Sequence, residues 1–241
     1  MMEPVEFITF GKLHNLYLLG TAGIWFILPF IGAMWMNPAQ RKVIAWVLCL
    51  LTVGNEIADD ILRLSLGIWS ASDDLPLHMC GFSIFLSAYA VVTKNQDAFE
   101  LAYFWGIAGA IQAIITPDPS RWPLGHISVF WNFLSHGIII LNVLWLIIAE
   151  GMRCRISSFY SVVMITCGTA FVVSFLNKWL DANYWFLCNP PGGDSPFLMG
   201  TFPDHLLAFA GFAFIIVWLI YIPMYLIAKR NVKTKKTEVV H

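Results

Sequence analysis

A series of long apolar segments constrains this chain more than any other feature of its sequence. One helical crossing of a bilayer takes about 20 predominantly apolar residues, and seven segments of this kind are separated by charged or turn residues. They cover approximately residues 14–36, 43–67, 77–93, 98–116, 127–149, 157–180 and 204–228. The alternating apolar and polar pattern of a membrane β-barrel does not recur. The sequence therefore predicts an all-α, polytopic membrane bundle of seven helices. The short third and fourth segments leave six spans as the alternative.

Composition favours the same class of protein. The 241 residues are 59% hydrophobic and 12% charged, whereas soluble domains average about 45–50% apolar and about 25% charged residues. We therefore expect one transmembrane domain over residues 1–230 and a basic cytoplasmic tail over 231–241. A soluble nucleic-acid-binding protein, a secreted disulfide-rich domain and a disordered regulator are excluded. The expected partners are membrane lipids and not nucleic acid.

Basic residues predict the orientation, because Lys and Arg near span ends are retained on the cytoplasmic side. With the amino terminus outside, ten of the fourteen basic residues fall on inner segments. These ten are Arg41, Lys42, Lys94, Arg153, Arg155, Lys229, Arg230, Lys233, Lys235 and Lys236. The sequence therefore predicts a multi-pass protein of a bacterial cell membrane, with the amino terminus outside and the carboxy terminus in the cytoplasm.

Ionisable residues inside apolar segments are candidates for function, because a charge in the bilayer core is costly. In the second segment, Glu56, Asp60 and Arg63 are spaced i, i+4, i+7 and share one helix face. We assign Asp60 to the solvated end of this helix and Glu56, which lies deeper, to a functional site. His78 opens the third segment, and His136 lies about 15 Å along the fifth. Both histidines are expected to face the same site as Glu56.

Other polar residues are divided between a cavity and the membrane interface. We expect a polar cavity, open to the outer side, whose substrate-binding residues are Gln112, Asn177, Asn183 and His205. His14, Glu100 and Glu150 are interpreted instead as interface residues with a solvated or anchoring role.

A histidine beside a carboxylate, with a thiol or hydroxyl in reach, supplies a base, its orienting group and a nucleophile. The base is His136 or His78, and Glu56 is the orienting carboxylate. The possible nucleophiles are Cys80, Ser83 and Ser135. The alternative is a metal that activates water, bound by His78, His136, His205 and Glu56. Because the His-x-x-x-His pair of seven-span zinc hydrolases is missing, we expect neither a metal nor a cofactor.

The five cysteines have no metal-binding spacing. Cys80 and Cys188 both fall near the outer side and could form a disulfide. Cysteines within membrane spans are more often small apolar fillers, and we favour that interpretation.

Four motifs occur in order along the chain. They are Leu75-Pro76-Leu77-His78-Met79-Cys80-Gly81-Phe82-Ser83, Ile114-Ile115-Thr116-Pro117-Asp118, Phe133-Leu134-Ser135-His136-Gly137, and Asn177 followed by Ala182-Asn183-Tyr184-Trp185-Phe186-Leu187-Cys188. In these motifs, over residues 40–230, the chain resembles the YwaF family of bacterial membrane proteins. It is similar, more distantly, to a eukaryotic transmembrane family of phospholipid acyltransferases that use a cysteine and a histidine.

The distant resemblance implies a site more directly than a reaction. Glu56, His78, His136 and Asn183 match that family, but its cysteine before the histidine is Leu77 in this chain. Either Cys80 or a serine takes the place of the nucleophile, or the chemistry differs. The expected function is that of an enzyme acting on lipid acyl groups, with Cys80 as the nucleophile. The alternatives are a transporter or ligand-binding protein and a non-catalytic helical bundle.

Overall fold

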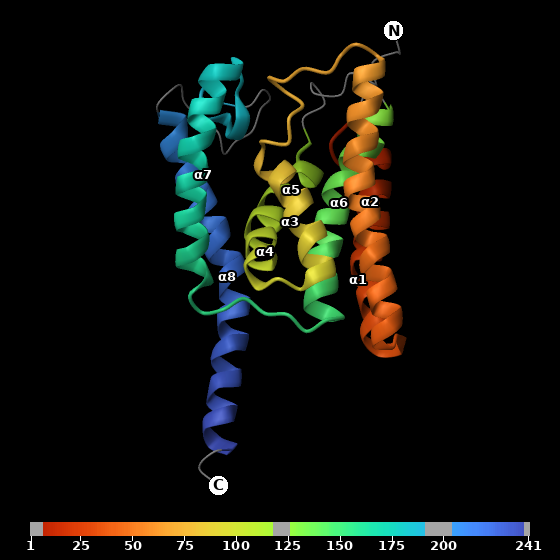
Figure 1. Ribbon diagram of the computed structural model, residues 1–241, viewed down its shortest axis with the longest axis vertical. Coiled ribbons are helices and arrows are strands. Elements are labelled where there is room, and N and C mark those ends of the chain that lie inside the picture. Colours follow the sequence, from red (N-terminus) through yellow and green to blue (C-terminus); the bar gives the residue numbers. More distant parts are fainter. Residues whose placement is uncertain (1–6, 118–125, 191–203, 239–241) are drawn as a thin grey trace.

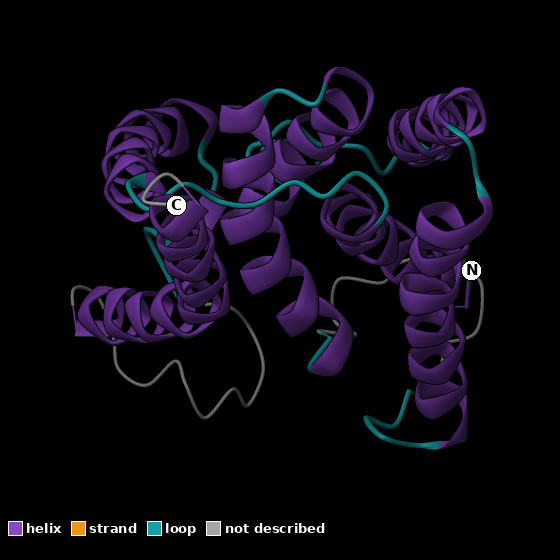
Figure 2. Cartoon of the chain, turned by 90° about the horizontal axis from the view of Figure 1, so that it is seen from below, coloured by secondary structure: helices purple, strands orange, loops and turns teal. Residues whose placement is uncertain are grey.

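The computed structural model describes residues 7–117, 126–190 and 204–238, and within these ranges it contains helices and no strand (Figure 2). The helices are α1 (Lys12–Trp35), α2 (Pro38–Ser65), α3 (Met79–Thr93), α4 (Gln96–Leu101), the π-helical η1 (Ala102–Gly106), α5 (Ile107–Ile115), α6 (His126–Ile148), α7 (Ser158–Leu180), the 3-10 turn η3 (Tyr184–Phe186) and α8 (Asp204–Glu238). The all-α prediction is confirmed. Each predicted apolar segment is helical, with α4, η1 and α5 forming one continuous helix.

Five of these helices are long and apolar enough to cross a membrane in the described part of the chain. They are Lys12–Trp35, Gln96–Ile115, Ile127–Ile148, Ser158–Leu180 and Asp204–Ile227. The 15-residue α3 is apolar but shorter than a full crossing. The 28-residue α2 is long enough but carries both basic and acidic side chains. The chain is therefore a multi-pass membrane protein by these criteria, and the count of seven stays a prediction.

Consecutive long helices run in opposite directions, with α1 and α2 on one side of the molecule and α7 and α8 on the other (Figure 1). Helices α3 to α5 lie between the two pairs. Helix α6 contacts α1, α2, α3 and α5 and is the centre of the packing. The described amino and carboxy ends emerge at opposite ends of the bundle (Figure 1).

Basic side chains gather at the end of the bundle from which the carboxy terminus emerges. Arg41 follows the α1–α2 turn, Lys94 lies between α3 and α4, and Arg153 and Arg155 lie between α6 and α7. All three connections lie at this end (Figure 1). The side chains of the predicted basic tail, from residue 228 onward, lie outside the described residues.

The core of the bundle is closely packed, and small residues allow the helices to approach. Phe99, Phe104 and Trp145 are each fully buried. A Cβ on Gly32 of α1 would lie 2.7 Å from the ring of Trp145 on α6, so this crossing requires glycine. By contrast, α1, α7 and α8 expose large apolar side chains to their surroundings, including Leu19, Trp179 and Leu207. Apolar side chains on the outer surface are typical of helices that face lipid.

Glu100 is buried and paired, so the prediction of a solvated or interface role for it is wrong. Its carboxylate is 2% exposed and accepts hydrogen bonds from Gln96, from the Arg155 backbone N–H and from the Arg155 guanidinium. Asp97 also pairs with Arg155. These contacts tie α4 to the segment before α7. Glu150 does lie at this face, where it pairs with Lys94.

His14 is also fully buried, which corrects its assignment to the membrane interface. Its Nδ1 accepts a hydrogen bond of 2.8 Å from the Phe10 N–H, so Nε2 carries the ring hydrogen and donates to the Ile114 carbonyl at 2.8 Å. Both ring nitrogens are engaged with backbone. His14 therefore connects the start of α1 to the end of α5.

Candidate functional site

The fold brings together two motifs that are more than 100 residues apart in sequence. The Tyr184 hydroxyl accepts a hydrogen bond of 3.0 Å from the Leu75 N–H and donates one of 2.9 Å to the Ala71 carbonyl. The Trp185 indole N–H donates to the Leu77 carbonyl at 2.7 Å. The loop before α3 is therefore bound along its length to η3.

His78 lies where these two segments meet. It is the N-cap residue of α3, and its Nδ1 accepts a hydrogen bond of 3.3 Å from the Trp185 N–H. The rings of Tyr184 and Phe186 pack against the imidazole at centroid distances of 5.0 and 5.4 Å. Because Nδ1 accepts, the hydrogen of the neutral ring lies on Nε2. His78 is thus arranged as a hydrogen-bond donor rather than as a base.

Three of the residues expected to bind substrate make hydrogen bonds to the backbone of η3 or of the residues just after it. Asn177 accepts from the Tyr184 N–H at 2.8 Å and donates to the Tyr184 carbonyl at 2.9 Å. Asn183 accepts from the N–H groups of the two residues after Leu187, each at 3.1 Å. His205 Nε2 donates to the Phe186 carbonyl at 3.0 Å. The fourth, Gln112, lies half-buried on α5 near Gly109.

These contacts explain how η3 keeps an unusual backbone. Trp185 and Phe186 have φ values of 58° and 53°, in the left-handed region that non-glycine residues rarely adopt. Such a conformation persists only when the surrounding structure imposes it. The polar side chains of α7 and α8 supply that constraint, and they position the aromatic rings around His78.

Cys80 packs against α5 at Gly109, where the helix has no side chain. The Cys80 Sγ atom is 3.0 Å from the position that a Cβ on Gly109 would occupy. The thiol is also within electrostatic reach of the half-buried Glu56 carboxyl group of α2. Two of the four predicted catalytic residues therefore lie on α2 and α3, which pack against each other.

The register between α5 and α6 places His136 on the face of α6 that packs against α5. The Asn132 amide donates to the Ala113 carbonyl at 3.1 Å, and a Cβ on Gly106 would lie 2.6 Å from Ile139. His136 lies between these two contacts, one helical turn after Asn132 and on the same face of α6. Among the described residues, only Cys80 has an atom within 4 Å of a Cβ built on Gly109.

The hydrogen bond of His136 determines its tautomer. Its Nδ1 is 2.8 Å from the carbonyl oxygen of Asn132. A carbonyl can only accept, so Nδ1 carries the hydrogen and Nε2 keeps its lone pair. Among the four histidines whose side chains the structure describes, His14, His78 and His205 have the hydrogen on Nε2. His136 therefore differs from them in presenting a basic Nε2.

A seam of buried polar groups between α2, α3 and α6 was missed by the sequence analysis. Asn142 is fully buried and donates to Thr52 at 2.9 Å and to Ser87 at 3.2 Å. About one turn further along α2, the Asn55 amide donates to the Ser135 hydroxyl of α6 at 2.9 Å. An asparagine in the middle of an apolar segment was the signal for this seam.

The acidic end of α2 forms an ion network. Arg63 pairs with Asp59 at 2.8 Å and with Asp74 at 3.1 Å, and Asp60 accepts from the Trp69 indole at 3.1 Å. These contacts fix the loop that leads to α3. Glu56 makes none of these hydrogen bonds or ion pairs, and its assignment to a functional site stays a prediction.

Neither a disulfide nor a metal cluster forms in the described residues. All five cysteines are free, so Cys80 and Cys188 do not pair. In the ranges that the structure covers, no three His, Cys, Asp or Glu side chains are grouped closely enough to hold a metal ion. The Pro- and Gly-rich segment over residues 188–203 falls for the most part outside the described residues. A cavity that the structure does describe is apolar and lies between α1 and α6.

Comparison with known proteins identifies the family. Residues 9–221 match the model of the TMEM164 family, which covers every predicted site residue. The chain belongs to the TMEM164 family. An uncharacterized protein of Treponema pallidum (strain Nichols) is 25% identical over 125 residues, or 49% of each of the two chains. The match thus spans about half the length of that curated relative. No solved structure matches the chain.

Gly81 of this TMEM164-family chain is expected to be required for the geometry around His78. A Cβ at this position would lie 2.7 Å from the Pro76 backbone, which has no flexible end that can move away. Gly81→Ala should therefore destabilise the protein by about 1–3 kcal/mol, measured by thermal unfolding in detergent. Gly168→Ala on α7, where nothing lies within 4 Å, is the control and should stabilise by roughly 0.5–1 kcal/mol. Equal effects would contradict this account of the loop.

Proposed function

We propose that this protein is a multi-pass membrane enzyme that transfers acyl groups from phospholipids, with Cys80 as the nucleophile and His136 as the general base. The observation that carries the proposal is the packing of Cys80, on α3, against Gly109 of α5, while His136 lies on α6, which packs against both of these helices. A thiol and a basic imidazole nitrogen on neighbouring helices are the minimum that nucleophilic acyl transfer requires.

The reaction begins when His136 Nε2 removes the thiol proton of Cys80. The Cys80 sulfur then attacks the carbonyl carbon of a phospholipid ester, and the bond from that carbon to the glycerol oxygen breaks. The leaving oxygen takes the proton back from His136, which yields a lysophospholipid and an acyl thioester on Cys80. A hydroxyl group, from water or from a second lysolipid, next gives its proton to His136 and takes the acyl group from the sulfur.

Glu56 has a supporting role in the proposal. It lies half-buried on α2, which packs against α3, the helix that carries Cys80, and its carboxyl group can donate a hydrogen bond when protonated. The Asn132 carbonyl binds Nδ1 of His136, and an orienting role for Glu56 stays a prediction.

The proposal includes the number of membrane spans and their orientation. Seven spans with the amino terminus outside place Arg41, Lys94, Arg153 and Arg155 together on the cytoplasmic face, in agreement with the retention of basic residues there. Helices α2 and α3 then supply the two remaining crossings, and Thr52 and Asn55 of α2 face α6. The host membrane is proposed to be a bacterial cell membrane, and the chain a member of the YwaF branch.

A trapped intermediate tests the proposal. The protein in vesicles of phosphatidylcholine with a radiolabelled acyl chain should become labelled, and neutral hydroxylamine should release the label because it cleaves thioesters. Cys80→Ala should abolish labelling. Cys167→Ala is the matched control, since Cys167 is an exposed cysteine on α7, and it should label like the unmodified protein.

Two results would overturn this mechanism. Label that persists in Cys80→Ala would place the nucleophile elsewhere, with Ser135 as the first alternative. No label in any variant, with unchanged products in the vesicles, would favour a non-catalytic bundle, in which the polar seam only holds the helices together.

A further inference from the structure

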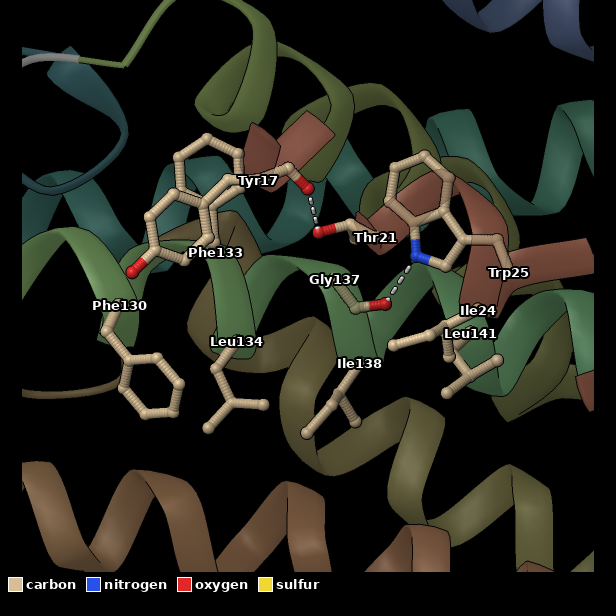
Figure 3. A pocket seen from close by; sticks show the side chains of 10 residues that line it. All are labelled: Tyr17, Thr21, Ile24, Trp25, Phe130, Phe133, Leu134, Gly137, Ile138 and Leu141. Atoms are coloured by element: carbon tan, nitrogen blue, oxygen red, sulfur yellow. Dashed lines mark hydrogen bonds between the residues drawn. The ribbon is translucent and has the colours of Figure 1, made fainter. Parts of the chain in front are cut away.

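A groove between α1 and α6 lies outside the proposed catalytic residues. It has a volume of about 150 Å³ and is lined by ten residues, including Tyr17, Ile24, Trp25, Phe130, Leu134 and Ile138 (Figure 3). We refer to it as the α1–α6 groove. Phe130, Leu134 and Ile138 project from α6 in the same direction, and Tyr17 and Phe133 stack at one end with centroids 4.9 Å apart (Figure 3).

The polar groups at the groove are already engaged within the protein. The Thr21 hydroxyl donates to the Tyr17 carbonyl at 2.7 Å, and the Trp25 indole N–H donates to the Gly137 carbonyl at 2.8 Å (Figure 3). No charged side chain is among the residues that line it. The groove therefore offers an occupant dispersion contacts and few hydrogen bonds.

The lining selects a hydrocarbon occupant. A water molecule needs two or more polar partners, and the groove offers few. A polar metabolite would lose its hydration without compensation. A free fatty acid would bring a carboxylate with no basic partner in the lining. An uncharged acyl chain satisfies all three conditions.

The groove is open to the surroundings of the bundle and close to the proposed site. Ile24 is 55% exposed and Phe130 is 45% exposed, both on helices that are apolar enough to cross a membrane. On α6, the lining residues Leu134 and Gly137 stand on either side of His136. A chain that enters from the bilayer therefore lies beside the helix that carries the general base.

We propose that the α1–α6 groove binds one acyl chain of a membrane glycerophospholipid and serves as the chain-binding subsite of the enzyme. The role of the groove as a substrate subsite rests on the proposed function. Binding of an acyl chain there does not require that the protein is an enzyme. The bilayer supplies the lipid directly, so no entry from water is needed.

Photolabelling in a catalytically silent protein tests the proposal. The Cys80→Ala protein is reconstituted in vesicles that contain a small fraction of phosphatidylcholine with a diazirine on one acyl chain. Label should map to lining residues of α1 and α6, and excess unlabelled phosphatidylcholine should compete for it. Adding Ile24→Trp, which extends an indole into the groove, should lower this label at least fivefold.

Ile27→Trp is the matched control. Ile27 lies on the same helix and is 62% exposed, but it does not line the groove, so the label should be unchanged. Label spread evenly over the exposed faces of α1, α7 and α8, or equal in the two tryptophan variants, would overturn the subsite. Since Cys80 is absent throughout, that failure is distinct from a failure of the thioester experiment.

Discussion

Replacing Arg155 by methionine is expected to destabilise the protein by about 3 kcal/mol. The cost arises at Glu100, whose side chain is 2% exposed and would be left as an uncompensated buried charge. Hydrogen bonds to Glu100, and then to Asp97, raise the pKa of the Arg155 guanidinium above its ordinary value, so this partner is always charged. Thermal unfolding in detergent should show Tm lowered by roughly 10 °C.

A double-mutant cycle separates the pair from its surroundings. Glu100→Gln removes the charge and keeps the shape, so Arg155→Met combined with Glu100→Gln should recover part of the stability lost in Arg155→Met alone. The half-exposed guanidinium can return to water, which makes Glu100→Gln the milder single change. If the double variant is no more stable than Arg155→Met, the burial of Glu100 is not the cause.

The helices of this fold were predictable from sequence because each depends on its own segment. Helix α7 was expected over 157–180 and occurs over Ser158–Leu180, since an apolar run between charged residues marks both ends. The burial of Glu100 was not predictable in this way. Its burial depends on Arg155, 55 residues later, and a single segment carries no information about such a partner.

The candidate site was predictable by residue and less so by arrangement. His136 and Cys80 could be named because each is a reactive group within an apolar segment. Their arrangement depends on α5, since Cys80 packs against Gly109 and the register of α6 along α5 sets the position of His136. His78 was expected beside His136, but the contacts to Trp185 and Phe186 place it at the outer end of α3.

Leu77 and Cys80 have different surroundings. The Leu77 carbonyl accepts from the Trp185 indole, and its side chain packs on the main apolar core. Cys80, one helical turn further on, instead packs against Gly109 of α5. If the proposed acyl transfer takes place, its nucleophile is therefore one turn inside α3 and not at the position before His78.

His136→Gln is expected to lower the rate of Cys80 acylation by about 100- to 10,000-fold, the contribution typical of a general base. Glutamine can still donate a hydrogen bond, but it has no nitrogen that accepts a proton. The readout is the initial rate of label transfer from radiolabelled phosphatidylcholine to Cys80. Photolabelling of the α1–α6 groove should be unchanged, because His136 is not among its lining residues.

His14→Gln is the control that distinguishes a base from a buried histidine. Both ring nitrogens of His14 bind backbone, so its replacement should lower the Tm while the folded protein keeps its acylation rate. His136→Gln should show the reverse pattern, with a near-normal Tm and a slow reaction. If both variants lose stability and activity in parallel, then His136 supports the packing of α6 as His14 supports α1, and it is not the general base.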